Sequence, residues 1–156
     1  MSNVIIDSCT YGKIVKDRDW EFLVEKIIKD KKFIVFNFRV IRDELRKAPK
    51  PILRIYDQIV STNMIQENKQ ISNLADEYYK QYKINGGGKG KKKIINDFKI
   101  VACASIKNCD LLFSDDDSTL KCKNALESYR IINLKKNYRT PTFYSITDLK
   151  KRYLTN

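Results

Sequence analysis

Hydrophobic residues along the chain follow two spacings, one typical of buried strands and one typical of helices. Short apolar runs rich in β-branched and aromatic residues predict strands, and these runs lie at 3–7 (NVIID), 33–38 (FIVFNF) and 111–113 (LLF). Apolar residues three and four positions apart predict helices. The helices expected in this way lie at 20–28, 39–47, 94–105 and 146–154.

Two further apolar stripes have helical spacing and extend the pattern. The first consists of Leu53, Tyr56, Val60 and Met64, and the second of Ile71, Leu74, Tyr78 and Tyr82. Towards the C-terminus we expect a short helix at 120–126 and a strand at 130–134. Strands that alternate with helices indicate an α/β fold, with a parallel sheet covered by helices on both faces. The 156 residues fit one domain, 1–156, without an internal repeat.

The segment 85–93 (NGGGKGKKK) interrupts this pattern. Its four glycines and four lysines predict a flexible loop. It is not a phosphate-binding P-loop, because the G-x-x-x-x-G-K-[ST] spacing is missing and no Ser or Thr follows the lysines. Lys89, Lys91, Lys92 and Lys93 either form a solvated surface or contact the backbone of a nucleic acid.

Charge and composition narrow the classes of function. Thirty-one Lys and Arg residues against nineteen Asp and Glu give a net charge of +12, which attracts polyanions. The chain has no histidine, and its four cysteines form no CxxC pair, so a structural zinc site is not expected. Free thiols and the absence of a long apolar run favour a cytoplasmic protein without a membrane partner.

Acidic residues lie at or near the ends of the predicted strands. Asp7 ends the first strand, Glu44 lies in the helix after the second, and Asp97 opens the helix that leads to the third, which is followed by 115–117 (DDD). Ligands of parallel sheets bind outside the carboxyl ends of the strands, so these acids are expected to converge. Clustered carboxylates repel one another unless a cation neutralises them, and an oxygen-only ligand set suits Mg²⁺ or Mn²⁺. Such ions at a phosphodiester orient a water molecule and stabilise the leaving oxygen.

The order of these motifs resembles a known family. The runs VIIDS, RDEL, NDFKIVACAS and LLFSDDD are similar to those of the PIN-domain nucleases, and most of all to the VapC-type toxins of prokaryotic toxin–antitoxin pairs. The matching positions are Asp7 with Ser8, Glu44 with Leu45, Asp97 ahead of Ala102 and Ala104, and Ser114 with Asp116. Cys9 and the Gly/Lys segment depart from the family pattern.

The resemblance implies a three-layer α/β/α fold with a central parallel sheet of four or five strands. It also implies an endoribonuclease that cleaves RNA with Mg²⁺ or Mn²⁺, frequently as a homodimer and with an antitoxin protein as a partner. The implied ligands and catalytic residues are Asp7, Glu44, Asp97 and Asp116. Ser8 and Ser114 are implied as auxiliary residues, with Asp115 or Asp117 as alternatives for the fourth acid.

Each of these residues also has a purely structural interpretation. Asp7 suits a turn at the end of a strand, and Glu44 suits a solvated acid paired with Arg42 or Arg46. Asp97 suits the first turn of a helix, where the helix dipole favours an acid. The triplet 115–117 suits an ordinary polar loop. Tyr78, Tyr79 and Tyr82 either stack on bases or pack in the core.

Two other functions compete with a nuclease. The run 115–119 (DDDST) reads as the DxDxT motif of haloacid-dehalogenase phosphatases. That reaction needs further motifs well downstream, and only 37 residues follow Thr119, so we reject it. The stronger alternative is a catalytically inactive PIN-like module that binds RNA or a partner protein. The two readings differ in whether the four acids meet around a cation.

Overall fold

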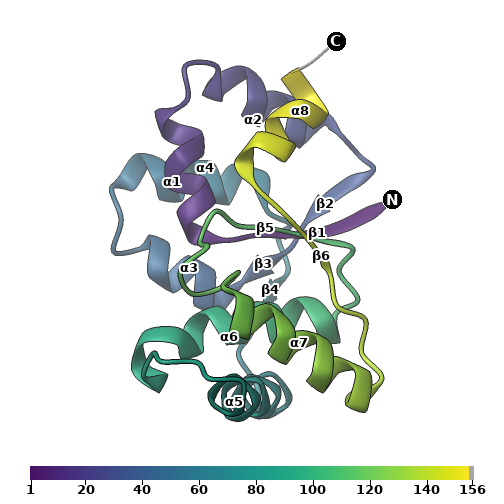
Figure 1. The fold of residues 1–156 in the computed structure, drawn as a ribbon. Helices are drawn as coiled ribbons and strands as arrows, with labels where there is room; N and C mark the ends of the chain where they lie inside the picture. The colour runs from purple at the N-terminus through teal and green to yellow at the C-terminus, as the bar shows by residue number, and fades with distance from the viewer. Residues whose placement is uncertain (155–156) are drawn as a thin grey trace.

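A four-stranded parallel sheet forms the centre of the computed structural model, which describes residues 1–154 (Figure 1). The strands lie in the order β2-β1-β5-β6, and every neighbouring pair is parallel. Their bounds are β1 Ser2–Ile6, β2 Phe33–Val35, β5 Leu111–Phe113 and β6 Thr142–Tyr144. A second, two-stranded parallel sheet pairs β3 (Asn37–Phe38) with β4 (Met64–Ile65).

Helices cover both faces of the main sheet. One layer contains α1 (Ser8–Lys16), α2 (Trp20–Lys29), α4 (Lys50–Ile59) and α8 (Ile146–Leu154), and the other contains α5 (Lys69–Ile84), α6 (Lys91–Ile106) and α7 (Lys123–Lys136) (Figure 1). The short helix α3 (Arg39–Leu45) lies beside the carboxyl end of β1. None of the helices in residues 1–154 has both the length and the apolarity that a membrane crossing requires.

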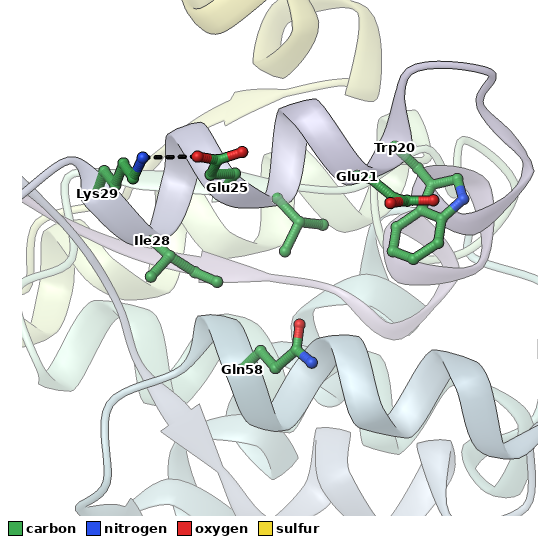
Figure 2. A pocket seen from close by; sticks show the side chains of 7 residues that line it. Trp20, Glu21, Glu25, Ile28, Lys29 and Gln58 are labelled. Atoms are coloured by element: carbon green, nitrogen blue, oxygen red, sulfur yellow. Dashed lines mark hydrogen bonds and ion pairs between the residues drawn. The ribbon is translucent and has the colours of Figure 1, made fainter.

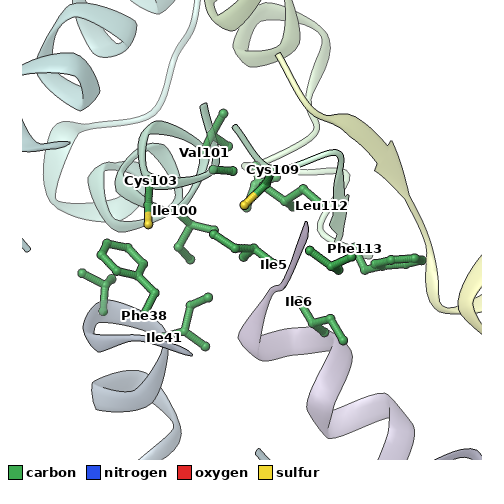
Figure 3. Close-up of a cluster of buried hydrophobic side chains, with 14 of the residues drawn as sticks. Ile5, Ile6, Phe38, Ile41, Ile100, Val101, Cys103, Cys109, Leu112 and Phe113 are labelled. Carbon is green, nitrogen blue, oxygen red and sulfur yellow. The ribbon is translucent and has the colours of Figure 1, made fainter. Parts of the chain in front are cut away.

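The core lies between the sheet and its helices. Val4, Ile5 and Ile6 of the inner strand β1 are all buried, as expected for a parallel strand covered on both faces. Figure 3 shows Ile5 between Ile100 of α6 and Leu112 of β5. The four cysteines are free, as the sequence predicted.

Most elements expected from the apolar pattern are present. Strands follow the runs at 3–7 and 111–113, and helices cover 20–28, 71–82, 94–105 and 146–154. The helix expected over 39–47 ends two residues early, at Leu45. Helix α1 and strand β6 were not expected. The sheet has four strands, within the predicted range.

Three predictions were wrong. The run 33–38 is not one strand, because the chain leaves the main sheet after Val35 and pairs again in the smaller one. Met64 lies in β4 and not on a helix, since α4 ends at Ile59. The strand expected at 130–134 is absent, because the helix expected at 120–126 begins at Lys123 and continues as α7 to Lys136, with buried residues that recur at helical spacing. These are Ala125, Ser128, Tyr129, Ile132 and Asn133.

The Gly/Lys segment is shorter than predicted. Helix α6 begins at Lys91, so the non-helical part ends at Gly90 and three of the four lysines form the first turn of α6. The hydroxyl of Tyr82 accepts a hydrogen bond from the Lys89 amide at 3.0 Å. A Cβ atom at Gly87 would lie 2.3 Å from the Tyr82 ring, so this close approach requires glycine.

Candidate functional site

Four elements bring Asp7, Glu44, Asp97 and Asp116 to the carboxyl edge of the main sheet. Asp7 follows β1 and caps α1, and Asp116 lies in the loop after β5. Glu44 projects from α3, and Asp97 lies in the second turn of α6, so the prediction that it opens the helix was wrong. Ser8 links Asp7 to Glu44, and Ser114 links Asp7 to the backbone of Asp116. The charges of these three acids raise the pKa of Asp97, in agreement with this arrangement.

Asp7 is the most deeply buried of the four, with 2% of its surface exposed. Its Oδ1 accepts a hydrogen bond from the Ser8 amide at 2.7 Å. Its Oδ2 accepts from the Ser114 hydroxyl at 2.9 Å and from the Cys9 thiol at 3.3 Å. Burial raises the pKa of Asp7, and the charge of Asp116 adds to this, although the hydrogen bonds oppose it. Asp7 therefore caps α1 and also faces the acidic cluster.

Only one carboxylate oxygen of Glu44 has a hydrogen-bond partner among residues 1–154. Its Oε2 accepts a hydrogen bond from the Ser8 hydroxyl at 2.9 Å, whereas its Oε1 is buried and has no hydrogen-bond partner within residues 1–154. Burial raises the pKa of Glu44, and the charge of Asp7 contributes. Pairing with Arg42 or Arg46 is wrong, because Arg42 binds Asp57 through two hydrogen bonds of 3.1 Å. The ion-pair partner of Arg46 is Asp43.

The pKa of Asp97 is raised to about 7. Burial is the largest cause, and the charges of Asp7, Asp116 and Glu44 add to it, whereas the nearby Thr119 side chain opposes it. Near neutral pH the carboxyl group therefore holds a proton part of the time, unless a cation compensates its charge.

The structure separates the three acids of the DDD run. Asp116 accepts hydrogen bonds from the amides and hydroxyls of Ser118 and Thr119, and these lower its pKa even though burial opposes them. Asp115 instead accepts from the Ile146 amide at 3.2 Å and anchors α8. Asp117 is 84% exposed and lies 3.4 Å from the Lys121 ammonium. Asp116 is therefore the acid of this run that faces the cluster.

Two contacts of the site were missed in the sequence. Cys9 lies two residues after Asp7 and donates to it, and burial raises the pKa of its thiol to about 12, so the thiol stays protonated. Thr119 lies three residues after Asp116 and donates to it from both its amide and its hydroxyl. The spacing Asp-x-Ser-Thr signals such local hydrogen bonds, because an Asp carboxylate readily accepts from amides two and three residues later.

The donor set consists of carboxylate oxygens, which suit a hard divalent ion. Within residues 1–154 no three Asp, Glu or Cys side chains lie in an arrangement that could hold a metal ion directly. Mg²⁺ commonly keeps several water ligands and binds through one or two carboxylates. The free Oε1 of Glu44 and the raised pKa values of its neighbours are what a site for a cation would show.

The predicted nucleic-acid contacts lie near α6. Lys91, Lys92 and Lys93 are exposed in its first turn, and Lys91 forms an ion pair of 2.9 Å with Asp76. Tyr78 and Tyr82 are buried, which places them in the core and excludes stacking on bases.

An apolar groove lies apart from the acidic cluster. Helix α2 and Gln58 of α4 line a cavity of about 300 Å³, which Figure 2 shows from close by. Its α2 residues are Trp20, Glu21, Val24, Glu25, Ile28 and Lys29. None of the four clustered acids lines it.

The fold is similar to that of solved structures, although sequence comparisons find no match. No protein-family model and no curated protein sequence matches the chain. Its structure is similar to VapBC2 from Rickettsia felis bound to a DNA fragment from their promoter, with 12% identity and a TM-score of 0.55 over 92% of this chain and 98% of the other. It is also similar to VapBC-1 from nontypeable Haemophilus influenzae, with 15% identity and a TM-score of 0.58 over 93% and 98%. The chain therefore has a VapC-like PIN fold, as the sequence motifs predicted.

Proposed function

We propose that the protein is an endoribonuclease that hydrolyses RNA phosphodiesters with Mg²⁺ or Mn²⁺. The observation that carries this proposal is the chain of hydrogen bonds through Ser8 and Ser114 that links Glu44, Asp7 and Asp116 beyond the carboxyl ends of β1 and β5. The raised pKa of Asp97, to which all three acids contribute, supports it. Burial and mutual repulsion disfavour their ionised forms, and a divalent cation relieves both effects. The net charge of +12 supports a polyanionic substrate.

The side chains of the site have distinct roles in this proposal. Asp7, Glu44, Asp97 and Asp116 would hold the ion directly or through its water ligands. When bound, the ion lowers the pKa of a water molecule and stabilises the leaving oxygen. Ser8 and Ser114 orient carboxylate oxygens, since one donates to Glu44 and the other to Asp7.

A cleavage assay tests this function. Purified protein should cut RNA with Mn²⁺ or Mg²⁺, and a chelator should stop the reaction. Asp7→Asn should abolish cleavage while the circular dichroism spectrum stays unchanged.

Asp116→Asn and Asp117→Asn form a matched pair, because the two acids are adjacent but only Asp116 faces the cluster. We expect Asp116→Asn to lower the cleavage rate at least about 100-fold, because it removes a ligand of the ion that stabilises the leaving oxygen. Asp117→Asn should cut RNA at the wild-type rate. Cleavage by Asp7→Asn at the wild-type rate would contradict the proposal.

A second candidate is a PIN-like module that binds RNA or a protein without cutting. One observation favours it, namely that no three acids among residues 1–154 are arranged to hold an ion directly. Titration calorimetry with Mn²⁺ separates the two functions. A nuclease binds Mn²⁺ and loses this binding in Asp7→Asn, whereas an inactive module retains RNA binding and shows no Mn²⁺ binding.

We also propose that the chain acts as the toxin of a VapBC-type pair and forms a homodimer. The likeness to two VapBC structures supports this role. Expression in a bacterial host should then arrest growth, the Asp7→Asn variant should not, and a small protein encoded next to this chain should relieve the arrest. Light scattering should give twice the 18.4 kDa of one chain. A monomer in solution would contradict the dimer but not the cleavage.

A further inference from the structure

A basic cavity opens on helix α3, the helix that carries Glu44, and on the turn that follows it. It has a volume of about 540 Å³ and is lined by Arg39, Asp43, Arg46 and Lys47. Three cations and one carboxylate face it. We call it the α3 pocket.

The cations of the α3 pocket have no close carboxylate partner among residues 1–154, although Arg39 Nε donates a hydrogen bond to the Gln66 side chain at 3.2 Å. The Asp43 carboxylate lies 3.9 Å from Arg39 and 3.8 Å from Arg46, at the long end of ion-pair distances, and all three side chains are more than 40% exposed. Lys47 forms no ion pair with any of the residues 1–154. Arg42 on the same helix contrasts with them, because Asp57 binds its guanidinium through two hydrogen bonds. Long, exposed ion pairs contribute little to stability. An external anion can therefore replace Asp43 as the partner of these cations.

The α3 pocket adjoins the acidic cluster. Lys47 lies in the turn that follows α3, and its backbone amide donates a hydrogen bond to the Glu44 carbonyl at 3.2 Å. The charge of Lys47 lowers the pKa of Glu44, against the effect of burial, so the ammonium group acts on that carboxylate through space. The pocket and the acidic cluster therefore share the segment that carries Glu44.

We propose that the α3 pocket binds a backbone phosphate of the RNA strand next to the phosphodiester that is cut. Guanidinium groups match phosphate oxygens with two parallel hydrogen bonds, and a lysine adds a point charge. Arg39, Arg46 and Lys47 supply both kinds of group at one cavity. This inference rests on the proposed nuclease function, and it names a substrate contact outside the four acids. It also predicts that contact at α3 does not depend on the base.

Binding measured without cleavage tests the α3 pocket. Fluorescence anisotropy with a labelled single-stranded RNA in EDTA, at several salt concentrations, compares wild type with the double variant Arg46→Gln/Lys47→Gln. The matched control is Lys31→Gln/Lys32→Gln, which removes the same charge at the opposite edge of the sheet, in the turn before β2. We expect the pocket variant to bind about 10-fold more weakly and to reduce the salt slope by about 0.7, the value for one lost phosphate contact on a single strand. Single-stranded DNA of the same sequence should show the same loss.

The result that would overturn the inference is an equal effect of the two double variants, since that would reflect net charge alone. Loss of binding to a polyglutamate peptide without loss of binding to RNA would overturn it too, in favour of an acidic protein ligand. In the cleavage assay with Mn²⁺ the pocket variant should raise KM and leave kcat nearly unchanged. If wild type does not cut RNA at all, the proposed function fails, while the anisotropy comparison still decides whether the pocket binds phosphate.

Discussion

Two serine hydroxyls connect the acids of the candidate site. The Ser8 hydroxyl donates to Glu44, and the Ser8 amide donates to Asp7. The Ser114 hydroxyl donates to Asp7 at 2.9 Å and accepts from the Asp116 amide at 3.1 Å. Because each hydroxyl fixes the position of a carboxylate, these residues set the geometry that a bound ion would find.

Replacement of Ser114 tests this arrangement. Ser114→Ala should lower Mn²⁺ affinity by about 10- to 100-fold, as loss of an outer-shell hydrogen bond commonly does. It should also destabilise the protein by about 1–3 kcal/mol, because Asp7 loses a buried donor. Calorimetric Mn²⁺ titration and urea unfolding measure the two effects. Ser128→Ala is the control, since Ser128 is equally buried but donates to the backbone of α7. A drop in Mn²⁺ affinity of the same size in both variants would count against the role of Ser114.

The raised pKa of Asp97 makes stability depend on pH in the absence of metal. Between an unfolded value of 3.8 and a folded value of about 7, the folded state keeps a proton that the unfolded chain releases. The contribution of Asp97 to stability is therefore complete below pH 3.8 and is lost as pH rises to 7. In EDTA, the stability of wild type relative to Asp97→Asn should fall by roughly 3 kcal/mol from pH 4.5 to pH 8, at about 1.36 kcal/mol per unit of pKa shift. Urea unfolding of both proteins across this range checks it. A difference that does not change with pH would show that Asp97 titrates normally.

The sequence predicted that the acids of the candidate site lie near one another, but it did not predict their hydrogen bonds. Asp7 was recognisable because a carboxylate directly follows the apolar run Val4–Ile6, and Asp116 because it follows Ser114 at the family spacing. The contact between Ser8 and Glu44 joins residues 36 positions apart and arises only when α1 and α3 pack together. The anchoring of α8 by Asp115 likewise depends on packing and has no local signal.

At the scale of elements, a buried polar network joins α5, α6 and α7. The hydroxyl of Tyr78 lies 3.1 Å from the Ser105 hydroxyl and donates to the side-chain oxygen of Asn133. The side-chain amide of Asn133 donates to the same serine at 3.0 Å. All three residues are buried, so these bonds fix how the three helices are oriented.

Removal of one hydroxyl should loosen this contact. Tyr78→Phe leaves Asn133 with a buried acceptor that has lost its donor, and we expect a loss of about 1–3 kcal/mol in urea unfolding. Tyr138→Phe removes a hydroxyl that accepts from Gln70 at an exposed position, and it should change stability by less than about 0.5 kcal/mol. Equal stabilities of the two variants would mean that the network contributes nothing.

The same network explains one wrong prediction about the elements. The consecutive apolar residues Ile131 and Ile132 suggested a strand, yet the buried positions of α7 include Ser128 and Asn133, which are polar. A pattern based on apolar residues misses a helix whose inner face carries polar partners of another helix. The strand β6 was missed for a related reason, because Thr142 and Tyr144 are exposed at the edge of the sheet.

At the scale of the whole molecule, basic residues lie on two helices that also carry acids of the candidate site, α3 with Glu44 and α6 with Asp97. The lysines of the Gly/Lys segment lie at the start of α6, whose second turn carries Asp97. Replacing Lys89, Lys91, Lys92 and Lys93 by Gln should weaken RNA binding and reduce the salt slope by up to about 3, or roughly 0.7 for each lysine that contacts a phosphate. Anisotropy at several salt concentrations measures both. If affinity and slope stay at wild-type values, these lysines are only a solvated surface.

The segment where the chain passes from the main sheet to the two-stranded sheet, which we call the corner, affects how stably the whole site is assembled. Helix α3 begins at Arg39, directly after a two-residue ladder in which the Tyr56 hydroxyl binds Asn37 at 2.7 Å and the Phe38 amide at 3.0 Å. Segments with so few backbone pairs open at lower free energy than central strands. Opening of this corner would carry Glu44 away while β1 and β5 remain paired. Mild heat or denaturant would then reduce the number of assembled sites well before the fold melts, and amide exchange would be faster at Phe38 than at Ile5.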